Sequence, residues 1–428
     1  MVLKASISLR GVPKAIGIVF SSYPILAAKK IPNYKTVRRW ITRVGHYKLY
    51  CPLEQGDEWA VITDASIQIG KHKCLMVIGI RLSQLKKGKT LSFEDFSPLV
   101  LEMHTHCNAQ AVYAALRKAR SRTGNIQVIC SDQGSDIVCG VKLYQKDHPE
   151  ASFIPDITHK VALLLKHDLG NDSEWLWFCR KANKTKKCAQ QTDLAHLSPP
   201  NQRSKCRFMN LETLLSWGKK ILEFLEREKD KATHDSKSVN KLFGWVRDFT
   251  VQINTWSNML EVCQITRHLV RTEMIDCNIA KKAMTAFSSL QLSGRASQLA
   301  EKIIIFLQEC VEKVPEGSMW IGTSEMIESL FGKLKHLERD QDNNGFTSFV
   351  LAAAACVGAI DVKTINQAFC HSKNKDITIW ERQNLGVTIQ ANRKQNLIAQ
   401  IDQKLTSGTN EMGQDYSGLQ ERDLAIAS

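Results

Sequence analysis

The stretch "EWAVITDAS", Glu58 to Ser66, is an apolar, β-rich run that contains one carboxylate, Asp64. A second β-rich run, "KCLMVIGIRL", spans Lys73 to Leu82, and a turn that contains Gly70 separates the two. This pattern predicts a β-hairpin. A charged side chain in an apolar run is costly unless it is paired or binds a cation. Asp64 is therefore the first candidate for a site residue.

Helix and strand signals alternate after the hairpin. "NAQAVYAALRKARSR" (Asn108 to Arg122) has the apolar spacing of an amphipathic helix, and "NIQVICSD" (Asn125 to Asp132) reads as a short buried strand. "ASFIPD" (Ala151 to Asp156) is a further candidate strand, and a helix follows it. A hairpin followed by helix–strand units predicts an α/β fold, with a mixed sheet and helices on its faces.

The N-terminal segment is strongly basic. The 428-residue chain has a formal net charge of +15. Residues 1–50 contain no Asp or Glu, and their basic residues are Lys4, Arg10, Lys14, Lys29, Lys30, Lys35, Arg38, Arg39, Arg43 and Lys48. A basic terminal module on a nearly balanced body points to a polyanion partner, most simply nucleic acid.

Residues 1–50 also have the layout of a helix-turn-helix. A helical stripe over residues 16–23 and the segment "PILAAKKI" (Pro24 to Ile31) precede a turn. A further helix is expected from the N-cap Asn33 to a stop at Gly45. We expect this helix to enter the major groove with Lys35, Arg38, Arg39 and Arg43. The alternative is a basic surface helix without DNA contact.

A long middle segment lacks strand signals. Residues 171–314 read as an all-α insertion, whose tryptophans are expected in helix cores, although one or two could stack on bases. A basic loop is expected from Lys181 to Arg207. The buried helix "FTSFVLAAAACVGAI" follows the insertion, and residues 401–428 form a polar tail that we expect to be disordered.

Asp132, at the end of the strand predicted over Asn125 to Asp132, is the second candidate acid, and a third lies on a late helix. In "GTSEMIESLFGKLKHL" (Gly322 to Leu337), an apolar stripe faces a core, and Glu328 and Lys335, seven residues apart, share another face. Asp64, Asp132 and Glu328 would give the oxygen ligands that suit Mg²⁺. Glu325 is the rival of Glu328, because the two share a face. Asp136, four residues beyond Asp132, is likewise the rival of Asp132.

These motifs resemble those of DDE transposases of the insertion-sequence kind, which share the RNase H-like fold of retroviral integrases. The resemblance rests on the order of Asp64, Asp132 and Glu328, and "MIESLFGKLK" is similar to the integrase-type Glu helix. The spacing from Asp132 to Glu328 is 196 residues (328 − 132). This long spacing resembles that of Mutator-like and hAT-like transposases, which carry a helical insertion between these two acids. "DITH", Asp156 to His159, is similar to their C/D-x-x-H motif, whose His lies near the cleavage site.

The resemblance implies an RNase H-like catalytic domain formed by residues 55–170 and 315–400. It implies two Mg²⁺ (or Mn²⁺) ions held by the three acids, and metal-dependent cleavage and strand transfer at the ends of a mobile element. The implied partners are double-stranded DNA and further copies of the chain, and Lys333 and Lys335 are expected to hold phosphates. The alternatives are an inactive, transposase-derived DNA-binding protein and an RNase H-fold nuclease.

The remaining composition bears on location. No segment has the roughly 18 uninterrupted apolar residues of a membrane span. Thirteen scattered cysteines, an odd number, suggest reduced thiols rather than a disulfide framework. We therefore expect a cytoplasmic protein, associated with the nucleoid if the source is a bacterium.

Overall fold

The core of the protein is a five-stranded mixed sheet. The computed structural model describes residues 1–23, 25, 29–54, 56–69, 72–202, 211–227, 234–292, 294–338, 346–385 and 397–400. The strands are β1 (Glu58–Ile69), β2 (His72–Arg81), β3 (Ser97–His104), β4 (Asn125–Ser131) and β5 (Ser152–Pro155). Their order is β3-β2-β1-β4-β5. β1 pairs antiparallel with β2 and parallel with β4, which confirms the predicted hairpin and mixed sheet.

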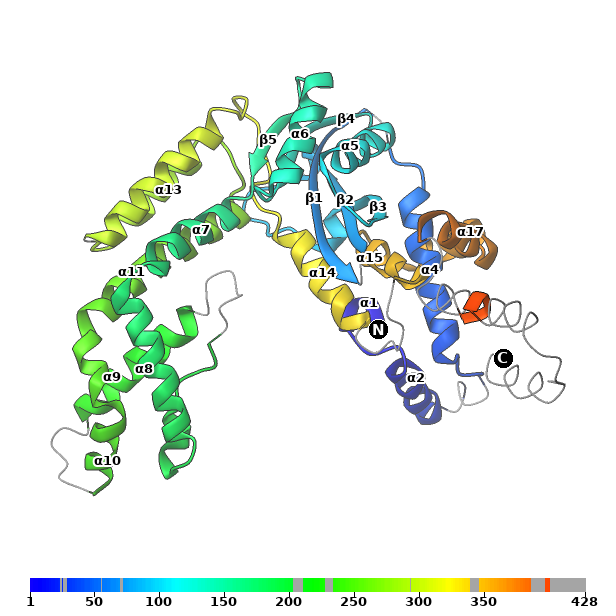
Figure 1. The fold of residues 1–428 in the computed structure, drawn as a ribbon. Coiled ribbons are helices and arrows are strands. Elements are labelled where there is room, and N and C mark those ends of the chain that lie inside the picture. Colours follow the sequence, from blue (N-terminus) through cyan, green and yellow to red (C-terminus); the bar gives the residue numbers. More distant parts are fainter. Residues whose placement is uncertain are drawn as a thin grey trace, which may run out of the picture.

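Helices cover both faces of this sheet. Because side chains alternate along a strand, successive residues enter different cores. Val61 and Ile129 pack toward α5 (Ala109–Thr123) and α6 (Ser135–Asp147). Ala60, Ile62 and Cys130 join the core that contains α14 (Glu325–Glu338) and α15 (Leu351–Cys356). The helices predicted at the positions of α5, α14 and α15 are thus confirmed, and Figure 1 shows them around the sheet.

The N-terminal segment contains α1 (Val2–Ala5), α2 (Gly11–Ser22) and α4 (Tyr34–Tyr50). The predicted N-cap of α4 is confirmed, because the Asn33 side chain accepts a hydrogen bond from the Thr36 amide at 2.8 Å. The predicted stop at Gly45 is wrong. A Cβ atom at Gly45 would lie 1.9 Å from the Leu351 carbonyl oxygen, so this glycine allows α15 to cross α4 closely. Part of the helix predicted over Pro24–Ile31 lies outside the described residues.

Helix α4 is packed into the body of the protein. It contacts α15, η5 (Ser348–Val350), α16 (Val362–His371), α17 (Asn374–Asn384) and strand β3. Its apolar residues Val37, Ile41 and Val44 are buried there. Helices α4 and α15 therefore lie side by side against the sheet, and α16 and α17 pack on α4 (Figure 1).

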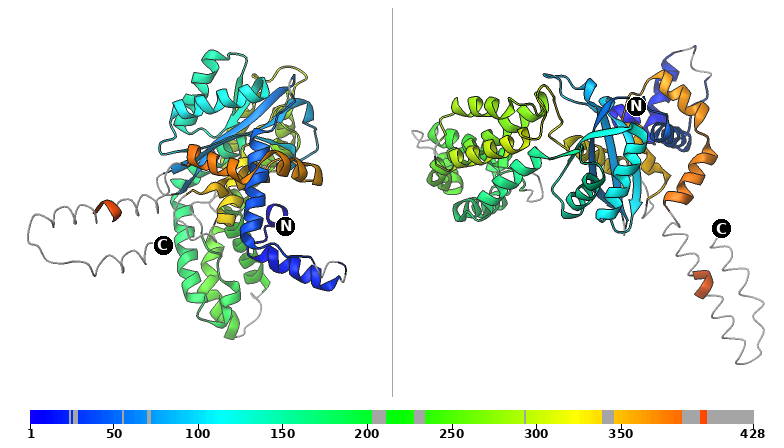
Figure 2. Two further views of the ribbon diagram at one scale, coloured as in Figure 1. Left: turned by 90° about the vertical axis from the view of Figure 1, so that its right-hand side faces the viewer. Right: turned by 90° about the horizontal axis from the view of Figure 1, so that it is seen from above.

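The insertion is helical, as predicted, and extends away from the sheet in all three views (Figures 1 and 2). Helix α7 (Ile157–Gly170) already packs against α11 (Thr250–Thr272) and α13 (Arg295–Val311), so the helical layer starts before the expected boundary at residue 171. Its other elements are α8 (Ser173–Ala189), η3 (Asp193–Leu197), α9 (Leu211–Arg227), α10 (His234–Phe243), η4 (Gly244–Phe249) and α12 (Ile279–Ser288).

Two predictions about the insertion have different outcomes. Trp175, Trp217 and Trp256 are buried, which confirms the predicted core role, whereas Trp177 is 40% exposed. The basic loop predicted from Lys181 is wrong over its first nine residues. They continue α8, with Ala182 and Ala189 buried in the core and the Thr185 hydroxyl accepting a 2.9 Å hydrogen bond from Trp245 Nε1. Residues 203–207 of that loop and the tail 401–428 lie outside the described residues.

No helix among the described residues is both long and apolar enough to cross a membrane.

Candidate active site

Three acidic residues from distant parts of the chain line one open pocket of about 510 Å³. Asp64 comes from β1, Asp132 directly follows β4, and Glu328 comes from α14. The other charged or titratable residues that line this pocket are Lys73, His159 and Lys335. All three acids that the sequence singled out are therefore brought together.

The sheet brings the two aspartates to the same place. β1 and β4 are parallel neighbours, and Ile62 is paired with Cys130, two residues before each aspartate. Because side chains alternate along a strand, Asp64 and Asp132 continue the rows of Ile62 and Cys130. Those rows face the core that contains α14. Strand pairing thus places both carboxylates at the same level, under the acid-bearing helix.

Helix α14 places Glu328 over them. Its stripe Ile327, Leu330 and Phe331 is at most 1% exposed, so the orientation of the helix is set by burial. Glu328 and Lys335 are two turns apart and both reach the pocket, as their spacing predicted.

The carboxylates influence one another electrostatically. Burial raises the pKa of Asp64 to about 7, and the negative charges of Asp132 and Glu328 add to this shift. The Ala65 amide donates a 2.6 Å hydrogen bond to Asp64 Oδ1, which opposes the shift by stabilising the charged form. A positive charge placed among these oxygens would therefore be stabilised.

Asp156 and His159 have different environments, although both were assigned near the site. Asp156 is buried and is the N-cap of α7, where its Oδ1 accepts from the His159 amide at 2.9 Å. Its Oδ2 accepts from the Ser324 amide at 3.1 Å and from the Ser324 hydroxyl at 2.5 Å. Asp156 thereby joins α7 to the start of α14. His159 lines the pocket with the three acids.

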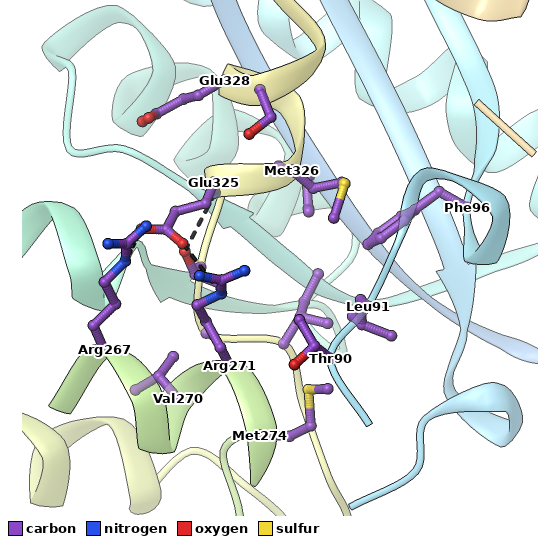
Figure 3. A pocket seen from close by; sticks show the side chains of 15 residues that line it. Thr90, Leu91, Phe96, Arg267, Val270, Arg271, Met274, Glu325, Met326 and Glu328 are labelled. Carbon is purple, nitrogen blue, oxygen red and sulfur yellow. Dashed lines mark hydrogen bonds and ion pairs between the residues drawn. The ribbon is translucent and has the colours of Figure 1, made fainter. Parts of the chain in front are cut away.

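The two rival acids lie elsewhere. Glu325 is paired with Arg267 and Arg271 of α11, and Figure 3 shows both guanidinium groups directed at its carboxylate. These residues line a second pocket of about 290 Å³, and Glu328 borders both pockets, whereas Glu325 borders only the second. Asp136 is exposed in the first turn of α6 and does not line the acidic pocket.

The lysines expected to hold phosphates are divided. Lys335 is exposed at the acidic pocket. The Lys333 ammonium instead donates to the Leu3 carbonyl and lies 5.5 Å from the centre of the Phe93 ring. Lys73 of β2 also lines the acidic pocket, and sequence reasoning missed it because a lone lysine beside a hairpin turn carries no signal of its own.

The basic residues of α4 are divided in the same way. Arg43 donates 2.6 Å hydrogen bonds to the carbonyls of Ser372 and Phe369, and Arg38 donates to the Thr347 hydroxyl at 2.8 Å. Lys35 and Arg39 are exposed. Of the four residues expected to contact DNA, Arg38 and Arg43 thus make intramolecular contacts, and Lys35 and Arg39 are exposed to solvent.

The donors of the acidic pocket suit a hard divalent cation in kind, because carboxylate oxygens are the ligands that Mg²⁺ prefers. The high pKa of Asp64 beside two further acids agrees with this chemistry. The spacing is looser than that of a formed site: within the described ranges, no three His, Cys, Asp or Glu side chains lie close enough together to hold a metal ion. The three carboxylates would have to come closer together to hold an ion.

Comparisons with known proteins add little. No protein-family model matches the chain, and no curated protein matches it. Among solved structures, the chain is similar to a chain of the "Drosophila P element transposase strand transfer complex". The identity is 14% and the TM-score 0.39, over 85% of this chain and 96% of that chain.

Proposed function

We propose that the protein is a DNA transposase with an RNase H-like catalytic domain, which cleaves phosphodiester bonds at element ends and joins them to target DNA. The observation that carries this proposal is the meeting of Asp64, Asp132 and Glu328 in one pocket. Those residues are far apart in the chain. The mixed sheet, in which the central strand β1 carries Asp64, also supports the proposed RNase H-like domain.

Asp64, Asp132 and Glu328 would hold two Mg²⁺ (or Mn²⁺) ions, which would stabilise the attacking and leaving oxygens of an in-line displacement at phosphorus. Lys335 and Lys73 would bind the phosphates that flank the scissile bond, so their contribution should fall as salt rises. Water as the nucleophile gives strand cleavage, and a freed 3′-hydroxyl gives strand transfer. Double-stranded DNA is the proposed partner, and two ends joined in one reaction would require a homo-oligomer.

The test uses labelled DNA from the flanks of the gene, with Mg²⁺, and the native protein beside three variants. We expect cleaved and joined products with the native protein, and none with Asp132→Asn or Glu328→Gln. The control Asp136→Asn changes the exposed rival acid outside the pocket, and it should react like the native protein.

Other outcomes would reject the proposal in distinguishable ways. Cleavage that depends on the acids but never yields joined products would identify a nuclease instead. Salt-sensitive DNA binding without cleavage in either Mg²⁺ or Mn²⁺ would identify a DNA-binding protein. Equal activity of Glu328→Gln and Asp136→Asn would show that the acidic pocket is not the active site.

A further inference from the structure

The first turn of α14 connects the acidic pocket to the insertion. Glu325 is the first residue of this helix, and Glu328 lies one turn later. Arg267 Nε lies 2.7 Å from Glu325 Oε1, and Arg271 Nε lies 3.5 Å from Glu325 Oε2. In Figure 3 both guanidinium groups approach Glu325 from below, whereas the carboxylate of Glu328 lies apart from them.

The opposite side of the same turn is attached to the sheet. Ser324 is 2% exposed, and its amide and hydroxyl both donate to Asp156 Oδ2. The Ile157 amide donates to the Gly322 carbonyl at 2.9 Å. The start of α14 is therefore held from the sheet through Asp156 and from the insertion through Arg267 and Arg271.

The charges explain why both sides are needed. Arg267 and Arg271 are four residues apart on α11, where like charges repel one another. Glu325 relieves this repulsion, because it accepts a hydrogen bond from Arg267 and forms an ion pair with Arg271, and its side chain is only 15% exposed. A carboxylate in the first turn is also stabilised by the helix dipole. Glu325 therefore fixes where α14 begins relative to α11.

We propose that Glu325 is a positioning residue: held by Arg267 and Arg271, it sets the first turn of α14 and thereby the place of the Glu328 carboxylate beside Asp64 and Asp132. This inference rests on the proposed function, because it assigns Glu328 to the metal-binding acids. It also gives the insertion a role, since α11 would hold an active-site helix in place.

The experiment measures Mn²⁺ affinity of the full-length protein by titration calorimetry, together with the rate of DNA cleavage. The informative variants are Arg267→Gln and Arg271→Gln. Removal of a positive charge near the acids should raise Mn²⁺ affinity by simple electrostatics. Positioning predicts the opposite sign: Mn²⁺ affinity and the cleavage rate at saturating DNA both fall, by roughly tenfold, as is common for groups that orient metal ligands.

Four further variants complete the design: Glu325→Gln, the double variant with both arginine substitutions, the triple variant that adds Glu325→Gln to it, and a control. Glu325→Gln should match the double arginine variant, and the triple variant should be no worse than that double, because the arginines act through Glu325. The control Glu273→Gln removes a carboxylate that pairs with Lys282 within the insertion, and it should leave Mn²⁺ affinity unchanged. If Glu325→Gln fails to fold, the arginine variants carry the same prediction.

Several results would overturn the inference. Increased Mn²⁺ affinity in the arginine variants would show that the arginines act only through their charge. Unchanged Mn²⁺ affinity with weaker, less salt-dependent DNA binding would assign them to phosphates instead. Either result leaves the proposed function intact, provided that Glu328→Gln still abolishes Mn²⁺ binding. A native protein that binds no Mn²⁺ would overturn both proposals.

Discussion

At the scale of single residues, buried charge is the feature that most needs an explanation. Asp64 lies in the apolar strand β1 with two further acids nearby, and its pKa is raised to about 7, first by burial and then by Asp132. Lys48 is 5% exposed, and its ammonium donates to the carbonyls of Ala355, Val357 and Gly358. The charges nearest to Asp64 are negative, whereas the Lys48 ammonium is surrounded by carbonyl oxygens.

Asp64→Asn should stabilise the metal-free protein while it abolishes catalysis. The unfolded Asp64 ionises near pH 4 and the folded one near pH 7, so its contribution to stability falls as pH rises through this window and is lowest above pH 7. The substitution removes that cost, and we expect a gain of about 1–3 kcal/mol in the free energy of unfolding at pH 7.5.

Thermal unfolding with and without Mg²⁺ checks this prediction. Mg²⁺ should raise the melting temperature of the native protein and of Asp136→Asn, but hardly that of Asp64→Asn. An Asp64→Asn variant that is less stable than the native protein without metal would contradict it.

Because Lys48 is buried, we expect the stability of the protein to depend on pH in the alkaline range. Burial lowers the pKa of Lys48 to about 8, from 10.5 for an ordinary lysine. The unfolded chain therefore binds more protons between these values, so the native protein should gain stability relative to Lys48→Met as pH rises from 8 to 10, by up to about 3 kcal/mol. Urea unfolding of both proteins at several pH values measures this difference, and a constant difference would show that the buried amine stays charged.

At the scale of elements, α4 shows how packing changes the meaning of a pattern. Its apolar stripe and its cap were predictable, because both depend on residues within two turns of each other. Its arginines were expected at the DNA, yet Arg43 binds the carbonyls of Ser372 and Phe369 and lies with its guanidinium 4.6 Å from the centre of the Phe369 ring. The partners of Arg43 are more than 300 residues away, so no local signal could reveal them.

Substitution of Arg39 and of Arg43 by alanine should therefore affect different properties of the protein. Arg43→Ala should lower the free energy of unfolding by about 1–3 kcal/mol, because it leaves two carbonyls without their charged donor. Arg39→Ala should leave stability within about 0.5 kcal/mol of the native value. If α4 binds DNA, Arg39→Ala should weaken binding and reduce the slope of log affinity against log salt by about 1.

Melting curves and DNA binding at three salt concentrations separate the two effects. An Arg43→Ala variant of native stability with weakened DNA binding would restore the sequence-based assignment of Arg43.

At the scale of the whole molecule, the N-terminal helices are part of the body that contains the sheet. The apolar side of α4 packs on α15, and Lys333 of α14 donates to the Leu3 carbonyl. The insertion is also attached at its exit, where Ile275 and Trp320 exchange backbone hydrogen bonds and Lys87 pairs with Asp276 at 2.6 Å. Removal of the N-terminal helices would therefore expose core surface.

Residues 51–428 should not form a stable domain without the first fifty residues. The deletion uncovers α15, whose six residues are at most 4% exposed in the full chain. We expect loss of cooperative thermal unfolding and binding of a hydrophobic dye at 25 °C. A truncated protein with the melting temperature of the full chain would show instead that residues 1–50 form a detachable module.

The sequence alone determined the features that depend on periodicity. The strands and the apolar stripe of α14 could be predicted, because burial imposes a period of about 2 on strands and about 3.6 on helices. The set Asp64, Asp132 and Glu328 came instead from acids at the ends of apolar runs and from a family resemblance. Only the tertiary structure showed that Glu328 and Glu325, and likewise Arg39 and Arg43, have different surroundings. Each pair shares a helix and similar chemistry, and what separates its members is the neighbours that folding brings from distant elements: the pocket with Asp64 for Glu328, Arg267 for Glu325, and the Ser372 carbonyl for Arg43.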